Sequence, residues 1–403
     1  MARIASMIAS TGITQLTGAG TNYLVITNGG VQYAVFVNTP TVSTTRIDFS
    51  KSTDGGVSWS TPTAVSSFGG ITQLSIWYDR WSGISGDLIH CAYVGTTADA
   101  TTYRSIDAAN SDTLSSEITI FDGGSTANGG ALSITRARGG NLYVKTMIDA
   151  GSEGGFFRSV DVGANWTSRT DSEALATTDQ WILLPSWNAD DQDAMMFFWD
   201  ASADEISRCL YDNSGDSWAE SSIAATMVDL AATTNYPNFA AAVDTTNSRN
   251  LLAAWSDNDI ANADLRVWHV TESAITEVTN VITNSTDDQG LCGISIDTST
   301  EDWYVFYFGN PDGGETYATI LQLYYKKSTD DGATWGSNTA VDPAGFNGAS
   351  GLFVCPRQAA SALPSLLYRV GPGNLTAPLI FSGEKPTAGS AGGAHILGGT
   401  VVR

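Results

Sequence analysis

A pattern of the form Ser-x-Asp-x-Gly-x-x-Trp occurs three times in the chain and constrains its fold more than any other feature. The residues that define it are Ser52, Asp54, Gly56, Trp59, Ser159, Asp161, Gly163, Trp166, Ser328, Asp330, Gly332 and Trp335. A short Asp side chain accepts hydrogen bonds from the N–H groups of a turn, Gly permits a positive φ, and Trp packs back onto its own hairpin. The pattern therefore predicts a repeated turn between strands, in which these residues are structural.

Apolar runs recur along the chain at intervals of about 50–60 residues, and each interval has room for four short strands. The second strand of each unit is centred near Val35, Ala92, Val144, Phe197, Ala253, Val305 and Leu367. Tight-turn signals such as Asn28-Gly29 separate the runs, and a decayed form of the Trp pattern persists at 211–218. This spacing predicts an all-β fold, a seven-bladed β-propeller of four-stranded antiparallel blades.

The two ends of the chain complement each other. The last unit lacks a fourth strand, whereas residues 3–9 form a strand-like run with no unit of their own. We expect this N-terminal strand to close the last blade, because closure removes an exposed sheet edge. The Gly-rich tail at 384–403 offers 395–403 as an alternative closing strand. The alternative fold has six blades plus an appended hairpin; in either case residues 1–403 form a single domain.

The three turn patterns resemble the Asp box, or bacterial neuraminidase repeat (BNR), of the sialidase-like β-propellers. The resemblance implies that each turn joins a third to a fourth strand, on the face opposite the ligand-binding loops. For a sialidase it also implies three arginines around the substrate carboxylate, a Tyr nucleophile with a Glu partner, and an Asp acid/base. The Arg-Ile-Pro motif of the first arginine is missing, since Arg46 is followed by Ile-Asp on a third strand. Arg136 and Arg357 end first strands near the Asp-box face, so sialidase activity is not expected.

The chain is strongly acidic, with a formal net charge of −23 from 19 Lys+Arg and 42 Asp+Glu. Such a surface repels nucleic acid and anionic membranes, so neither nucleic-acid binding nor membrane insertion is expected. The loops that enter first strands, and those that join second to third strands, contain no Lys or Arg. Residues 1–10 lack the apolar core of a Sec signal peptide. The widely spaced Cys91, Cys209, Cys292 and Cys355 are expected to be buried free thiols, with a Cys292–Cys355 bridge as the alternative.

Two functions remain open after these exclusions. The preferred one is a non-catalytic recognition or structural propeller, carrying carbohydrate or protein partners at the surface of a virion or another extracellular assembly. The alternative is a glycoside hydrolase that uses carboxylates of the acidic face, because two carboxylates at suitable separation suffice for this reaction. Candidate ligand-face residues are Glu153, Asp200, Asp257, Asp259, Asp312, Glu315, Trp181, Tyr236 and Tyr317. Solvated loop acids and core or rim aromatics are the structural alternatives for these positions.

No cofactor is expected from a full motif. Oxygen-rich clusters at Asp257-Asn-Asp259 and Asp190-Asp191-Gln-Asp193 have the ligand chemistry of a Ca²⁺ site, but neither carries the complete spacing of a calcium loop. The histidines, at 90, 269 and 395, accompany no Gly-x-Ser-x-Gly elbow, and His90 lies in an apolar run that predicts a core position.

Overall fold

The described part of the chain consists of strands and the turns between them. A computed structural model describes residues 3–9, 22–41, 44–78, 87–95, 100–123, 131–149, 153–172, 179–200, 202–203, 205–225, 239–255, 265–278, 281, 289–309, 323–341, 353–357, 365–369 and 379–384. Within these ranges the chain forms strands β1 to β29, which makes it an all-β protein. Among the same residues there is no helix long and apolar enough to cross a membrane.

Six sheets are each built from strands that follow one another in the chain, and we number them as blades 1 to 6. Blade 1 contains β2 (Leu24–Ile26), β3 (Gln32–Thr41), β4 (Thr44–Ser52) and β5 (Thr63–Ala64). Blade 2 contains β6 (Ile71–Tyr78), β7 (Leu88–Gly95), β8 (Ala100–Asp107), β9 (Thr113–Leu114) and β10 (Ile118–Asp122). Blade 3 contains β11 (Leu132–Arg136), β12 (Leu142–Asp149), β13 (Glu153–Ser159) and β14 (Thr167–Arg169).

The remaining three of these sheets follow the same plan. Blade 4 contains β15 (Gln180–Pro185), β16 (Ala194–Asp200), β17 (Glu205–Asp212) and β18 (Ser217–Ala225). Blade 5 contains β19 (Phe239–Asp244), β20 (Arg249–Trp255), β21 (Leu265–Val270) and β22 (Ile275–Glu277). Blade 6 contains β23 (Gln289–Asp297), β24 (Asp302–Gly309), β25 (Leu323–Ser328) and β26 (Thr339–Ala340). The predicted propeller of four-stranded antiparallel blades is therefore confirmed, with a fifth short strand, β9, in blade 2, and these six blades match the blade count of the alternative fold.

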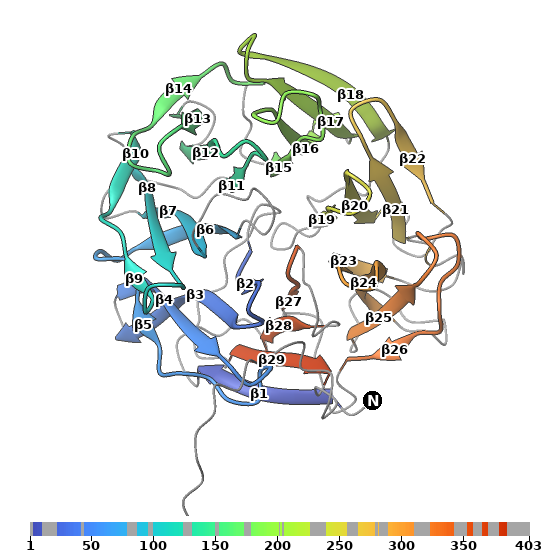
Figure 1. The fold of residues 1–403 in the computed structure, drawn as a ribbon, viewed down its shortest axis with the longest axis horizontal. Coiled ribbons are helices and arrows are strands. Elements are labelled where there is room, and N and C mark those ends of the chain that lie inside the picture. The colour runs from blue at the N-terminus through green and yellow to red at the C-terminus, as the bar shows by residue number, and fades with distance from the viewer. Residues whose placement is uncertain are drawn as a thin grey trace, which may run out of the picture.

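A seventh sheet, the terminal sheet, joins strands from both ends of the chain. It contains β27 (Phe353–Val354), β28 (Leu366–Arg369), β29 (Leu379–Glu384) and β1 (Arg3–Ala9). β1 pairs antiparallel with β29, so that Arg3 lies opposite Glu384. Figure 1 shows this sheet between blades 6 and 1, with β27 towards the centre and β1 outermost. The pairing of β1 agrees with the expected closing strand, whereas the alternative strand at 395–403 lies outside the described residues.

The core lies between the blades, because each sheet packs its faces against its neighbours. Inner strands are buried almost throughout: every residue of β11 is buried, and β15 is buried from Trp181 to Pro185. The outer strands β14 and β22 are mostly exposed. A continuous apolar cluster runs from Trp77 of blade 2 to Val270 of blade 5. The four cysteines are buried and free, as expected.

Candidate functional site

The three Ser-x-Asp-x-Gly-x-x-Trp turns share one hydrogen-bond pattern, which blade 3 illustrates. Ser159 Oγ donates to Asp161 Oδ1 at 2.8 Å and accepts the N–H of Gly163 at 2.8 Å. Asp161 then accepts the N–H of Asn165 at 2.9 Å and the Asn165 side-chain amide at 2.6 Å. The corresponding bonds recur in blades 1 and 6. These carboxylates are engaged within their own turns, which is the role that the sequence predicted for them.

One member of this turn was missed by the sequence reasoning. The residue just before each Trp is Ser58, Asn165 or Thr334, and each donates its side chain to the second oxygen of the Asp. A side-chain donor at this position in all three copies was the available signal. In the first copy the two bonds from Ser58 lower the pKa of Asp54 to about 2, against a small opposing effect of burial.

The Trp of each turn joins neighbouring blades. Trp166 donates its Nε1–H to the carbonyl of Gly163 at 3.1 Å, and its ring centroid lies 5.4 Å from that of Tyr103 in blade 2. The φ of Gly163 is +89°, and a Cβ at this position would lie 2.1 Å from the Tyr103 ring. Glycine is therefore required here twice, by the backbone angle and by the ring.

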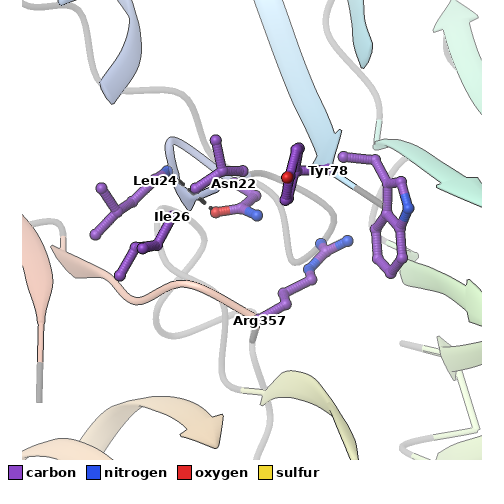
Figure 2. A pocket seen from close by; sticks show the side chains of 7 residues that line it. Asn22, Leu24, Ile26, Tyr78 and Arg357 are labelled. Carbon is purple, nitrogen blue, oxygen red and sulfur yellow. Dashed lines mark hydrogen bonds between the residues drawn. The ribbon is translucent and has the colours of Figure 1, made fainter. Parts of the chain in front are cut away.

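The axial end of the propeller on the side of these turns is crossed by the segment that follows β27. The carbonyl of Pro356 accepts a hydrogen bond from Ser295 Oγ of blade 6, and the carbonyl of Arg357 accepts the N–H of Val243 in blade 5 at 3.1 Å. The Arg357 side chain points towards Asn22 and Tyr78 (Figure 2). The segment thereby links the terminal sheet to the inner strands of blades 5 and 6.

The pocket around Arg357 is too small for a ligand of the expected class. Its free volume is about 10 Å³, which holds about one water molecule. Arg357 is 7% exposed, and burial lowers the pKa of its guanidinium to about 10, so it stays charged at neutral pH. We therefore interpret Arg357 as a structural residue near the centre of the propeller.

The predicted ligand-face residues are not brought together by the described structure. Asp200 ends β16, where its Oδ1 accepts the N–H and hydroxyl of Ser202 at 2.8 and 2.7 Å and the N–H of Ala203 at 3.1 Å. Burial opposes ionisation of Asp200, but these bonds outweigh it and lower its pKa. Glu153 begins β13, opposite Asp149 in the ladder. The following candidates lie outside the described residues: Asp257, Asp259, Asp312, Glu315, Tyr236 and Tyr317.

The position of the Trp181 side chain differs from the expectation that this residue stacks on a sugar. Its side chain is fully buried between blades 3 and 4. Its Nε1–H donates to the carbonyl of Lys145 at 3.3 Å, and the Lys145 ammonium lies 5.1 Å from the centre of its ring. Both faces of an inner strand are covered by neighbouring blades, so an aromatic residue there packs in the core.

A larger cavity, the blade-4 pocket, lies at the ends of the blade-4 strands, on the side of the propeller that carries the Trp turns. Its volume is about 280 Å³, and its lining residues are Ser186, Asn188, Asp193, Leu210, Tyr211, Asp212, Ser217, Trp218 and Ala219. Several of these belong to the decayed turn pattern at 211–218. The pocket was not predicted, because its wall combines two separate turns of the same blade.

The two carboxylates of the blade-4 pocket have opposite environments. Asp193 is 3% exposed; its Oδ1 accepts the N–H of Asn213 at 2.8 Å and its Oδ2 accepts the amide of Asn188 at 2.9 Å. Burial raises the pKa of Asp193, and the nearby charges of Asp190 and Asp212 act in the same direction. Asp212 is exposed and accepts hydrogen bonds within its own turn, which lower its pKa. One carboxyl therefore holds its proton more tightly than usual and the other less tightly.

An ordered aromatic wall borders these carboxylates. The Trp218 ring lies 4.9 Å from Phe156 and 5.0 Å from Tyr211, measured between centroids. Its Nε1–H donates to the carbonyl of Thr170 at 2.9 Å, which fixes the ring in its plane. The partly exposed Trp218 thus offers the pocket a preorganised aromatic surface.

The expected calcium chemistry has no support at the described cluster. Asp190 Oδ1 accepts the N–H of Gln192 at 2.9 Å, and Asp193 is bonded to Asn188 and Asn213 as described. No group of three or more His, Cys, Asp or Glu side chains is arranged to hold a metal within the described ranges. The second cluster, Asp257-Asn-Asp259, falls in a range that the structure does not describe.

Comparisons with known proteins place the chain by fold. No protein-family model and no curated protein matches it. Among solved structures, a polysaccharide lyase of a new family, PL25 ulvan lyase, aligns with a TM-score of 0.53 and 11% identity over 93% of this chain and 94% of its own. The same lyase bound to -[GlcA(1-4)Rha3S]- aligns equally well at 10% identity, again over 93% and 94%. The NanB sialidase of Streptococcus pneumoniae has a TM-score of 0.50 and 12% identity over 74% of this chain and 67% of its own.

These findings establish a propeller fold of the sialidase-like and lyase type, and they correct one expectation. The sequence favoured a non-catalytic module, but the lyase and the sialidase named above are enzymes. The interpretation of the chain as a non-enzyme is therefore wrong by this comparison. Nothing in the comparisons points to a virion or structural role.

Proposed function

We propose that this protein is a glycoside hydrolase, with Asp193 and Asp212 of the blade-4 pocket as its pair of carboxylates. The observation that carries the proposal is a cavity of about 280 Å³ in which two carboxyl groups face different surroundings. The matched structures of a polysaccharide lyase and a sialidase add support, because both are carbohydrate-active enzymes with a similar fold. The alternative that the sequence left open is thereby preferred.

The two environments suit the two roles that this reaction needs. Glycoside hydrolysis requires one carboxyl that is protonated and one that is ionised, and burial is the usual means of separating their pKa values. Asp193, whose pKa is raised, gives its proton to the glycosidic oxygen as the bond from that oxygen to the anomeric carbon breaks. A water oxygen bonds to the anomeric carbon, and the water's proton passes to Asp212. The products are a free sugar and an alcohol.

A sialidase remains an unsuitable assignment for this pocket. Binding of the sialic acid carboxylate by a guanidinium fork is bidentate, and the lining residues of the blade-4 pocket include no arginine. Two carboxylates there would repel the substrate's own negative charge. A hydrolase of another glycoside class is therefore the proposal.

A panel of fluorogenic glycosides tests this function directly. Wild-type protein should release the fluorophore from at least one of them, and Asp193→Asn or Asp212→Asn should lower kcat/KM by about 10²- to 10⁴-fold. The matched control is Asp200→Asn, because Asp200 also sits in a turn of blade 4 but lines neither described pocket. Thermal unfolding of each variant checks the fold. A wild-type protein inactive on every glycoside, or two Asp variants within tenfold of wild type, would refute the proposal.

We further infer that the terminal sheet serves as a seventh blade of the same ring. Its strand order places β27 innermost and β1 outermost, which is the order of first and fourth strands in blades 1, 3, 4, 5 and 6. Deletion of residues 1–9 should therefore lower the melting temperature sharply, since it leaves β29 with an open edge. An unchanged melting temperature would mean that β1 is an accessory strand.

A further inference from the structure

We infer that the blade-4 pocket takes one uncharged sugar unit at the end of a glycan chain, with its ring against Trp218. This inference rests on the proposed hydrolase function and adds the class of substrate. Three features of the described residues carry it: the size of the cavity, its buried side, and the charges around it.

The volume of the pocket fits one sugar ring. Because the Arg357 pocket of about 10 Å³ holds about one water molecule, the blade-4 pocket of about 280 Å³ has ample room for a sugar ring with its hydroxyl groups. Pockets for larger organic ligands begin at about the volume found here, so the cavity lies at the lower end of the range.

One side of the pocket is formed by buried residues. Tyr211 is 1% exposed and Asp193 is 3% exposed. Tyr211 is held there by its hydroxyl, which donates to Asp216 at 2.8 Å and accepts from Arg169 at 2.7 Å. Because Asp193 lies on this buried side, we infer that a glycan enters by its end, so that the bond behind the terminal unit reaches Asp193.

The charges at the pocket favour an uncharged unit. Its lining residues include Asp193 and Asp212 and no Lys or Arg. Two arginines touch lining residues from outside. Arg138 donates to the carbonyls of Ser186, at 2.8 Å, and Asn188, and Arg169 bonds Tyr211 and pairs with Asp216 at 3.2 Å. Their N–H groups are directed to these protein oxygens, so neither presents a fork to a sugar carboxylate.

The aromatic wall supplies the apolar contact that such a sugar needs. The C–H face of a pyranose packs on an aromatic ring, while its hydroxyl groups seek polar partners. Exposed polar side chains that line the pocket are those of Ser217 and Asn188. Trp218 is locked by Thr170 and Phe156 before any ligand arrives, so little conformational entropy is lost on binding.

Trp218→Leu and Trp166→Leu form a matched pair of variants for the test. Both residues hold the last position of the turn pattern, but only Trp218 lines the pocket. Trp218→Leu should raise KM for a neutral 4-methylumbelliferyl hexoside about tenfold. Trp166→Leu should lower the melting temperature and leave KM unchanged. Equal KM changes in the two variants would overturn the role of Trp218.

The substrate class is tested by comparing products and by binding. Neutral hexosides should be cleaved at least tenfold faster than the corresponding glucuronide and sialoside, and a neutral oligosaccharide should yield monosaccharide first. Preference for an acidic glycoside, or release of internal fragments, would overturn this inference while leaving the hydrolase proposal intact. If no glycoside is cleaved, the hydrolase proposal fails, and saturation-transfer NMR with methyl hexopyranosides decides the binding part. A signal lost in Trp218→Leu supports it, and no signal from wild type overturns it.

Discussion

The turns at the ends of β13 and β17 occupy equivalent places in neighbouring blades, but they are built differently. In blade 3, Ser159 and Asp161 direct all their described side-chain hydrogen bonds into their own turn. In blade 4 the Ser and Asp positions of the turn pattern are held by Tyr211 and Asn213. Asn213 Oδ1 accepts the hydroxyl of Tyr143 at 2.9 Å and the Arg158 guanidinium at 2.7 Å, both from blade 3.

This difference explains why the turn of blade 4, unlike that of blade 3, lines a pocket. The side chains of Ser159 and Asp161 bond within the blade-3 turn, and the neighbouring blade reaches this turn through Tyr103, whose hydroxyl donates to the carbonyl of Val162 at 3.2 Å. The blade-4 turn uses its side chains across the blade interface, and its local bonds fall to Asp212, which accepts from Ser214 and Gly215. Asp212 therefore lines the cavity together with Asp193, whereas Asp161 lines neither of the two pockets described above.

The two turns are expected to differ most in how much stability is lost when their glycines are replaced by alanine. Gly163→Ala should destabilise the protein by about 2–4 kcal/mol, because alanine disfavours the positive φ and its Cβ would strike the Tyr103 ring. Gly215→Ala should cost about 1 kcal/mol, since the nearest atom to its Cβ is the movable carboxylate of Asp212 at 2.7 Å. Urea unfolding of both variants measures the difference. Equal losses would show that the two turns are equally rigid.

A smaller effect is expected at the first position of each turn. Ser159→Ala removes a buried acceptor and leaves the N–H of Gly163 without its partner, at a cost of about 2 kcal/mol. Tyr211→Phe removes the bonds to Asp216 and Arg169 but keeps the ring in place, at a cost of about 1 kcal/mol. The free energies of unfolding of the two single variants test this order. The reverse order would mean that the interblade bonds of blade 4 matter more than the local bonds of blade 3.

The smallest expected effect concerns how stability depends on pH, because the contributions of Asp54 and Asp193 change with pH in opposite directions. The folded-state pKa of Asp54, in the blade-1 copy of the turn, is lowered to about 2, so its contribution to stability is present above the usual Asp pKa and lost as pH falls through about 2. The pKa of Asp193 is raised, so its contribution is present at low pH and lost as pH rises through the raised value. In a plot of melting temperature against pH, Asp54→Asn should reduce the slope at the acid end. Asp193→Asn should reduce the slope at higher pH, where Asp193 loses its proton. Profiles that change with the same sign would contradict the two assignments.

Much of the fold was accessible from the sequence because its signals are local. The turn pattern determines three hairpins by hydrogen bonds between residues at most four positions apart, such as the bonds from Gly163 to Ser159 and from Asn165 to Asp161. The recurrence of apolar runs then gives the strand order within each blade. The pairing of β1 with β29 followed from one missing strand and one surplus strand.

The candidate site was not accessible in the same way, because it depends on contacts between separate turns. Asp193 belongs to an acidic cluster with only incomplete calcium-site spacing, and the structure places it beside Asn188 and Asn213. Trp181 was a candidate for stacking on a sugar, with core packing as an alternative, and it lies on an inner strand covered on both faces. Neither outcome is encoded in the spacing of nearby residues.

The union of β1 with β29 also has a consequence for how the chain is made. During synthesis β1 must wait, without its sheet partner, until residues 379–384 have been made. The terminal sheet can form only after that point, and bringing together segments so remote in the chain is a slow entropic search. If translation pauses before this point, the unpaired edge of β1 is exposed to other chains. We therefore expect the nascent chain to depend more on chaperones when translation pauses there.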